Sequence, residues 1–176
     1  ELIQLVRQGL DLQGDEVLLD AYTGVGVIAV LISPYVKKVL AVEESAAAIA
    51  DARENAQGLD NLEFLLGKTE DVLQDLTEKP DVVVLDPPRA GCQPRALHSL
   101  LELAPSKIVY VSCDPETLAR DLKILCSGDY SVQQIQPLDM FPQTHHVECV
   151  AILNRLDSND SIVLASGSPR RRELLT

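Results

Sequence analysis

The chain is poor in aromatic side chains, in methionine and in positive charge. Its 176 residues include no tryptophan, two phenylalanines and one methionine. Lysine and arginine together number 15 against 27 aspartates and glutamates, which gives a formal net charge of -12. Proteins that hold a phosphate backbone use clusters of Lys and Arg, so this composition argues against strong nucleic-acid binding by the chain alone.

A long hydrophobic run, a signal peptide and a paired cysteine motif are also missing. No apolar stretch approaches the roughly 18 to 20 residues that a membrane span needs, and no secretory leader is visible. The cysteines, at positions 92, 113, 126 and 149, form no C-x-x-C pair, so the sequence suggests neither a zinc site nor a redox motif. We therefore expect no membrane partner, no metal and a cytoplasmic location. The chain begins with Glu1 rather than Met, and we expect it to be part of a longer protein.

Short apolar runs alternate with helix-like segments along most of the chain. The strand-like runs are 17–20, 39–43, 62–66, 82–85, 108–111, 132–135 and 147–153. The helix-like segments are 1–12, 27–31, 45–57, 70–76, 95–103 and 116–125. This alternation predicts an α/β fold of the Rossmann-like type, with a mostly parallel twisted sheet and helices on both faces. The last two strands are joined without an obvious helix, which predicts an antiparallel edge strand.

The first predicted strand is followed by a glycine turn at residues 20–26 (DAYTGVG). Glycines there permit a tight turn and the close approach of a ligand to the backbone. Glu43 ends the second strand, where a carboxylate can accept both ribose hydroxyls of a nucleoside cofactor. Residues 24–29 also satisfy G-x-G-x-x-A, a dinucleotide fingerprint. Asp20, four residues before the first glycine, favours the cationic S-adenosylmethionine over a pyrophosphate; a tight turn that holds no ligand is the third interpretation.

Two later strands end in side chains that suit covalent chemistry. Asp86 follows the run 82–85, and Cys113 follows the run 108–111. In open α/β sheets the functional groups collect beyond the carboxyl ends of the strands, so the sequence predicts a thiol and a carboxylate in one crevice. A lone cysteine at a strand end is otherwise most simply a small packed hydrophobe.

Residues 86–91 (DPPRAG), residues 108–117 (IVYVSCDPET) and residues 138–148 (LDMFPQTHHVE) give the chain a specific resemblance. In this order they resemble the signatures of the RNA (uracil-5-)-methyltransferases, which make 5-methyluridine in tRNA and rRNA. The resemblance covers about residues 1–154. It implies transfer of a methyl group from S-adenosylmethionine to C5 of a uridine in structured RNA.

The resemblance also implies roles for individual residues. Cys113 is the nucleophile and Glu148 the base, while Asp86 positions the target base or touches the donor, and Pro87 and Arg89 contact the substrate. The donor is held by Asp20, Tyr22, Gly24, Gly26, Glu43 and Asp86. A thiolate that adds to C6 of uracil makes C5 nucleophilic, and a carboxylate can then remove the C5 proton. Arg89 or a helix N-terminus near Pro115 would help the thiol to ionise.

Several positions depart from the family or have other interpretations. Thr23 stands where the family often has Cys, and Lys68 stands where many methyltransferases have an acidic residue that meets adenine. The RNA-binding regions of the family, often an OB-like module, would precede Glu1, so we expect most RNA affinity to come from there. Cys92, Cys126 and Cys149 are interpreted as structural, and the neighbouring histidines at 145 and 146 as loop residues rather than metal ligands.

The alternatives that stay open are a methyltransferase of another target, an NAD(P)-binding oxidoreductase and an inactive fragment that only binds S-adenosylmethionine. We expect a methyltransferase domain over residues 1–155, a linker over 156–160 and a tail over 161–176. The tail (SIVLASGSPRRRELLT) resembles the first strand and phosphate loop of the Maf-type nucleotide pyrophosphatases. It is too short for that fold, so we expect no pyrophosphatase activity.

Overall fold

The computed structural model of the chain describes residues 1–139 and 148–156. The helices are α1 (Leu2–Leu10), α2 (Val27–Ile32), η1 (Ser33–Tyr35, a 3-10 turn), α3 (Ala46–Asn55), α4 (Thr69–Asp75), α5 (Pro94–Leu103) and α6 (Pro115–Leu125). The strands are β1 (Val17–Asp20), β2 (Lys38–Glu43), β3 (Leu62–Leu66), β4 (Val82–Leu85), β5 (Lys107–Ser112), β6 (Tyr130–Leu138) and β7 (Glu148–Arg155).

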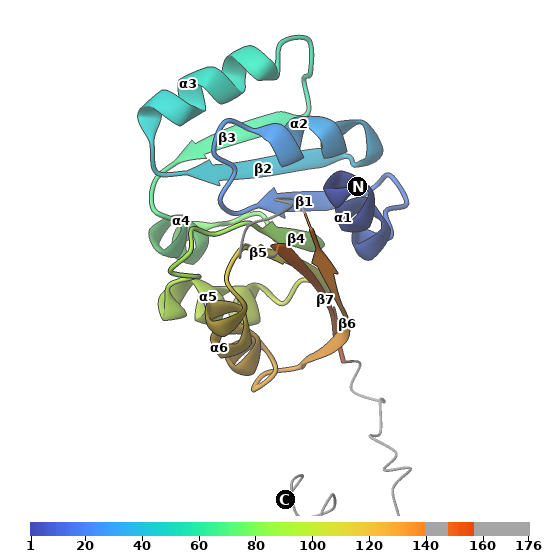
Figure 1. Ribbon diagram of the computed structural model, residues 1–176. Helices are drawn as coiled ribbons and strands as arrows, with labels where there is room; N and C mark the ends of the chain where they lie inside the picture. The colour runs from blue at the N-terminus through green and yellow to red at the C-terminus, as the bar shows by residue number, and fades with distance from the viewer. Residues whose placement is uncertain (140–147, 157–176) are drawn as a thin grey trace, which may run out of the picture.

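The strands form a seven-stranded sheet in the order β3-β2-β1-β4-β5-β7-β6. The first five strands of the chain are parallel to one another, and β7 runs antiparallel to both β5 and β6. The predicted fold class, a mostly parallel sheet with an antiparallel edge, is therefore confirmed (Figure 1).

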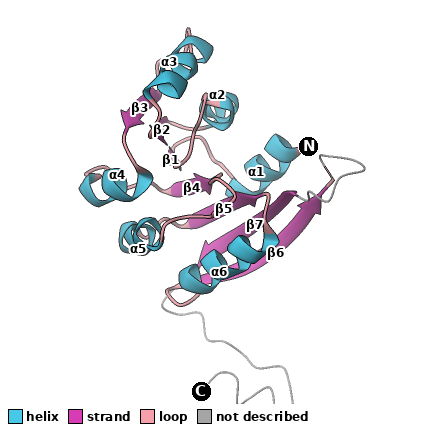
Figure 2. Cartoon of the chain, turned by 60° about the vertical axis from the view of Figure 1, so that its left-hand side comes forward, coloured by secondary structure: helices cyan, strands magenta, loops and turns pink. Residues whose placement is uncertain are grey.

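Helices cover both faces of this sheet, as the sequence predicted. Helices α1, α2 and α3 lie on one side, and α4, α5 and α6 lie on the other (Figure 2). Adjacent residues of one strand pack against the helices on opposite faces of the sheet, because side chains alternate along a strand. Leu18 packs with Val6 and Ile28 of the first helical layer, while Leu19 packs with Leu97 of the second.

Strand β6 is longer than the sequence predicted. The apolar pattern indicated a strand near 132–135, whereas the strand runs from Tyr130 to Leu138. It is an edge strand that pairs only with β7, and most of its side chains are solvent-exposed, so its hydrophobic pattern is weak. An irregularity in pairing between Val132 and Gln134 breaks the alternation further.

One edge of the sheet gathers the polar residues singled out from the sequence. The carboxyl ends of the parallel strands lie at this edge, together with the amino end of the antiparallel β7. The residues that follow across it, in strand order from β2 to β7, are Glu43, Asp20, Asp86, Cys113 and Glu148. From β1 the chain adds β2 and β3 on one side of the sheet, and it then crosses back to add β4 and β5 on the other side. Ligands bind in open α/β sheets at such a switch point, which here lies between β1 and β4.

Candidate active site

The carboxyl group of Asp20 lies beneath the glycine turn and is fully buried. Its Oδ2 accepts a hydrogen bond of 2.7 Å from the Thr23 hydroxyl and one of 3.1 Å from the Ala29 backbone N–H. Ala29 belongs to the first turn of α2, so one carboxyl group ties the turn to the helix that follows it. Asp20 does not line the cavity above the turn. Its direct contact with a donor therefore stays a prediction, beside an observed role in shaping the turn.

The two glycines of the turn have different surroundings. Gly24 and Gly26 have φ values of 55° and 82°, which glycine adopts without strain. A Cβ added at Gly26 would lie 3.1 Å from the Cβ of Ala52 on α3, so Gly26 permits close packing of helix on turn. A Cβ added at Gly24 would meet no atom within 4 Å. Gly24 thus presents bare backbone to open space, as a cradle for a ligand requires.

A cavity of about 660 Å³ opens above the turn, within the size range of small-molecule sites. Of the residues predicted to hold a donor, four line it: Tyr22, Gly24, Glu43 and Asp86. Thr23 and Lys68, noted from the sequence as departures from the family pattern, also line it. The lining residues that the sequence did not single out as donor contacts are Val25, Val27, Ile28, Glu44, Thr69, Glu70, Pro88, Ala90, Gly91 and Gln93. Most of these follow β2, β3 or β4, so their place after a strand end was the available signal.

Glu43 is held in a fixed orientation at the side of this cavity. One carboxylate oxygen accepts from the Gly24 N–H at 3.1 Å, and the other accepts from the Ser45 N–H at 2.8 Å. Each oxygen keeps acceptor capacity for a further donor such as a hydroxyl. The carboxylate is therefore pre-organised for two neighbouring hydroxyl groups.

The charge of the cavity is mainly negative. Glu43, Glu44, Glu70 and Asp86 line it, against Lys68 alone among the basic residues that do so. Partial desolvation by the surrounding cavity wall, with a smaller contribution from the charge of Glu148, raises the pKa of Asp86 to about 6, although the residue itself is solvent-exposed. An acidic lining of this kind favours a cationic ligand over a pyrophosphate.

Burial also raises the pKa of Asp20 to about 7, and the nearby charge of Asp86 adds to the shift. Asp20 is therefore partly protonated near neutral pH, because its charged form lacks full solvation. The sequence attributed the preference for a cation to Asp20, and this stays a prediction. The acidic side chains that line the cavity, Glu43, Glu44, Glu70 and Asp86, are a second source of negative charge there.

Cys113, the predicted nucleophile, directly follows β5, and Glu148, the predicted base, opens β7, so extending the register of these paired strands by one residue brings the two positions opposite one another. The β5–β7 ladder ends with Ser112 opposite Cys149. In an antiparallel pair the next residue of one strand lies near the previous residue of the other, which here are Cys113 and Glu148. Cys113 and Glu148 are both half-buried. The Glu148 charge reaches Asp86 at the end of β4, so this thiol and two carboxyl groups occupy one stretch of the sheet edge.

Helix α6 begins beside the thiol. Asp114 caps the helix, since its Oδ1 accepts from the Glu116 and Thr117 N–H groups at 3.0 Å each. These hydrogen bonds lower the pKa of Asp114, and the charge of Arg89 contributes to the same shift. Arg89 therefore lies close enough to the start of α6 to act on it electrostatically. Pro87, which was predicted to contact substrate, is buried and does not line the cavity.

The other cysteines have surroundings that fit the structural interpretation in part. Cys92 and Cys149 are buried, whereas Cys126 is exposed. Burial raises the pKa of the Cys92 thiol to about 12, so it stays protonated at neutral pH. The histidines at 145 and 146 lie outside the described residues. Within residues 1–139 and 148–156 no cluster of three or more potential ligands could hold a metal ion, and no helix there is long and apolar enough to cross a bilayer.

The fold is that of a methyltransferase domain. The family model described as "Methyltransferase small domain" matches residues 3–109, more than half of the chain. The solved rRNA methylase of Streptococcus thermophilus shares the fold with a TM-score of 0.72 at 17% sequence identity, covering 89% of this chain and 98% of that one.

More specific matches narrow this class. The family model "tRNA (Uracil-5-)-methyltransferase" matches residues 73–156. An uncharacterized RNA methyltransferase of Clostridium acetobutylicum is 50% identical over 151 residues, which are 83% of this chain and 33% of that protein. Another from Gloeobacter violaceus is 44% identical over 156 residues, covering 88% of this chain and 34% of its own length.

A solved structure agrees with these matches. The tRNA (uracil-54, C5)-methyltransferase of Pyrococcus abyssi, solved with S-adenosyl-L-homocysteine, is 38% identical. The two structures have a TM-score of 0.75, over 86% of this chain and 37% of that one. The chain belongs to the RNA (uracil-5-)-methyltransferase family. It spans about a third of the length of the curated relatives it matches.

Proposed function

We propose that the chain is the catalytic domain of an enzyme that methylates C5 of a uridine in structured RNA, with S-adenosylmethionine as the methyl donor. The observation that carries this proposal is the placement of Cys113 and Glu148 at adjoining ends of β5 and β7, beside Asp86. A thiol and a carboxylate on the same edge are the two groups that methylation of a pyrimidine C5 requires.

The cavity beside these groups suits the donor. Its acidic lining complements the cationic sulfonium and amino group, and the fixed carboxylate of Glu43 suits two ribose hydroxyls. Gly24 leaves the space that a close ligand needs. When bound there, S-adenosylmethionine supplies an electrophilic methyl group. Lys68 also lines the cavity. Contact with the adenine would therefore involve a positively charged lysine at the position where many methyltransferases have an acidic residue.

The chain's own residues carry out the rest of the reaction. The Cys113 thiolate forms a bond to C6 of the uracil, and the electron pair of the C5–C6 double bond moves toward C5 and the O4 carbonyl. C5 then takes the methyl group. Glu148 accepts the C5 proton, the double bond re-forms, and the bond between sulfur and C6 breaks to return the thiolate. We assign to Asp86 and Arg89 the orientation of the base during these steps.

The RNA is held largely by regions outside this chain. The net charge of -12 and the acidic cavity do not favour a phosphate backbone. The chain aligns with only about a third of each relative, and we place most of the RNA affinity in the regions that correspond to the rest of these proteins. Whether the target belongs to tRNA or rRNA is decided there. The compartment we propose is the cytoplasm, because all the cysteines are free thiols.

A trapped adduct tests this proposal. The full-length protein is incubated with donor and with RNA that contains 5-fluorouridine, in which fluorine replaces the proton that Glu148 must remove. We expect a denaturation-resistant protein–RNA adduct that Cys113→Ala abolishes and Cys126→Ala, a control at an exposed cysteine, leaves intact. On ordinary RNA, Glu148→Gln should accumulate the same adduct. Full methylation by Cys113→Ala would contradict the covalent mechanism.

A further inference from the structure

A buried polar network joins α6 to the loop that follows β4, and none of the steps above uses it. Its centre is the fully buried carboxyl group of Asp121 on α6. Oδ2 of Asp121 accepts from the Cys92 backbone N–H at 2.7 Å and from the Tyr110 hydroxyl at 2.6 Å. Oδ1 accepts from Nε of Arg120 at 2.8 Å. Every one of these donors is therefore satisfied by one carboxylate.

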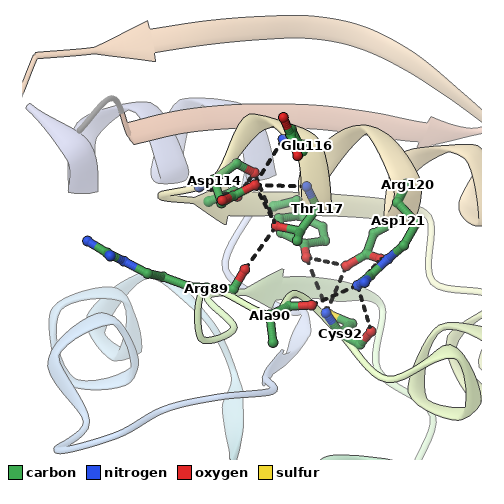
Figure 3. A network of polar contacts seen from close by, with 10 residues as sticks. Arg89, Ala90, Cys92, Asp114, Glu116, Thr117, Arg120 and Asp121 are labelled. Carbon is green, nitrogen blue, oxygen red and sulfur yellow. Dashed lines mark hydrogen bonds and ion pairs between the residues drawn. The ribbon is translucent and has the colours of Figure 1, made fainter. Parts of the chain in front are cut away.

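Two more side chains of α6 extend the network along the loop (Figure 3). Arg120 donates through Nη2 to the carbonyl oxygen of Ala90 at 2.9 Å and to that of Cys92 at 3.3 Å. The hydroxyl of Thr117 donates to the carbonyl oxygen of Arg89 at 3.1 Å. Successive backbone groups of the loop, from residue 89 to residue 92, are thus held by a single helix.

The close contact depends on the absence of a side chain at Gly91. A Cβ at this position would lie 2.5 Å from Nη2 of Arg120 and 2.6 Å from Oδ2 of Asp121. Gly91 also has a φ of 74°. The glycine of the DPPRAG segment therefore admits the charged pair of α6 against the backbone.

This network connects the two parts of the proposed site, which are the start of α6 next to Cys113 and the loop after β4 that forms part of the donor cavity. Helix α6 starts at Pro115, just after Cys113. The loop starts at Asp86, and its residues Ala90 and Gly91 form part of the cavity wall. We propose that Asp121, together with Arg120, is a positioning group that fixes this loop against α6 and so sets the spacing between the Cys113 thiol and the donor cavity. The inference rests on the proposed function for the reaction that it serves.

Stability alone is a weak reason for such an arrangement. The Arg120–Asp121 ion pair contributes little net stability by itself, because the half-exposed Arg120 side chain is screened by water while burial of the Asp121 carboxylate carries a desolvation cost. Its geometry is specific, however: the planar guanidinium of Arg120 reaches a carboxylate and two carbonyl oxygens at once. A lysine ammonium has the charge but not this fork. Specific geometry is what a positioning group requires.

Substitutions at Arg120 separate positioning from folding. Arg120→Met removes the guanidinium group and its hydrogen bonds to the loop, whereas Arg120→Lys keeps a positive charge beside Asp121. Arg95→Met is a matched control, because Arg95 is an exposed arginine on α5 that pairs with Asp71 on α4, outside the network. Thr117→Val removes the hydroxyl that contacts the Arg89 carbonyl oxygen and the helix cap Asp114, and it leaves the Arg120–Asp121 pair intact.

Two measurements are made on each variant. The first is the affinity of the 176-residue chain for S-adenosylhomocysteine, by calorimetry. The second is the single-turnover rate of adduct formation by the full-length protein on 5-fluorouridine RNA, with both substrates saturating. A misplacement of about 1 Å can cost on the order of a hundredfold in rate. We expect Arg120→Met to lose on the order of tenfold or more in both quantities, with partial recovery in Arg120→Lys, a smaller loss in Thr117→Val and no loss in Arg95→Met.

Each alternative result has a definite meaning. Unchanged affinity and rate in Arg120→Met, at an unchanged unfolding temperature, would overturn the inference. So would losses that simply follow the unfolding temperature while Thr117→Val behaves as wild type. If the wild-type protein forms no adduct but Arg120→Met still weakens S-adenosylhomocysteine binding, the proposed function fails and the positioning of the cavity wall by α6 stands.

Discussion

Gly24 and Gly58 form a matched pair that tests whether the cavity above the glycine turn binds the donor. Both have positive φ values, 55° at Gly24 and 84° at Gly58, and a Cβ at either would meet no atom within 4 Å. An alanine in this backbone conformation costs about 1–2 kcal/mol, offset by about 0.4–1 kcal/mol through the lower entropy of the unfolded chain. Gly24→Ala and Gly58→Ala should therefore each lower the free energy of unfolding by about 1 kcal/mol.

Only Gly24 lines the cavity, so the two variants should differ in binding. A methyl group at position 24 would occupy space that a bound nucleoside needs. We expect the affinity for S-adenosylhomocysteine to fall at least about tenfold in Gly24→Ala, which is about 1.4 kcal/mol, and to stay unchanged in Gly58→Ala. Urea unfolding measures the free energy of unfolding of each variant, and titration calorimetry measures its affinity for S-adenosylhomocysteine. Equal binding by the two variants, whether both tight or both weak, would refute the assignment of this cavity to the donor.

Other predictions concern the buried groups near the turn and the start of α3. The pKa of Asp20 is raised from 3.8 to about 7, so protonation favours the folded state. Its contribution to stability is fully present below about pH 4 and is lost as the pH rises through 7. Asp20→Asn should therefore weaken the pH dependence of the urea unfolding midpoint between pH 4 and 7, and an unchanged pH dependence would contradict the burial argument. Thr23→Val removes the 2.7 Å hydrogen bond to Asp20 and should cost about 1–3 kcal/mol in urea unfolding, because it leaves a buried acceptor with one donor fewer; a cost near zero would show that the hydroxyl is dispensable. Ser45 caps α3 by accepting from the Ala48 N–H, so Ser45→Ala should lower the unfolding free energy by about 1 kcal/mol, with Ser127→Ala as an exposed control.

The sequence predicted the sheet edge better than the cavity. Strand ends such as 82–85 and 108–111 could be located because a buried parallel strand is a short apolar run that stops at a polar turn. The order of the strands then brings Asp86 and Cys113 together, as expected for consecutive βα units. Ala90 and Gln93 could not be assigned to the cavity in the same way, since their approach to the glycine turn depends on how the loop after β4 folds back over the sheet.

Buried charges were the other feature that the pattern did not reveal. Asp121 lies on the amphipathic helix α6 between Arg120 and Leu122, and a carboxylate in such a helix is normally expected to be solvent-exposed. Its burial depends on Tyr110 and on the absence of a side chain at Gly91, which are distant in sequence. Asp20 was likewise expected in contact with a ligand, and only its hydrogen bonds to Thr23 and Ala29 show that it supports the turn from below.

The position of β7 has a consequence for the order in which the domain can be completed during synthesis. Although β7 follows β6 in the chain, it lies between β5 and β6 in the sheet, and β6 has no other partner among the described strands. A nascent chain that has emerged only as far as Leu138 contains the five parallel strands that pair with one another, but β6 still lacks its partner and Glu148 has not yet been made. The end of the sheet beyond β5 is therefore completed only when β7 is synthesised and pairs with the strands on both of its sides.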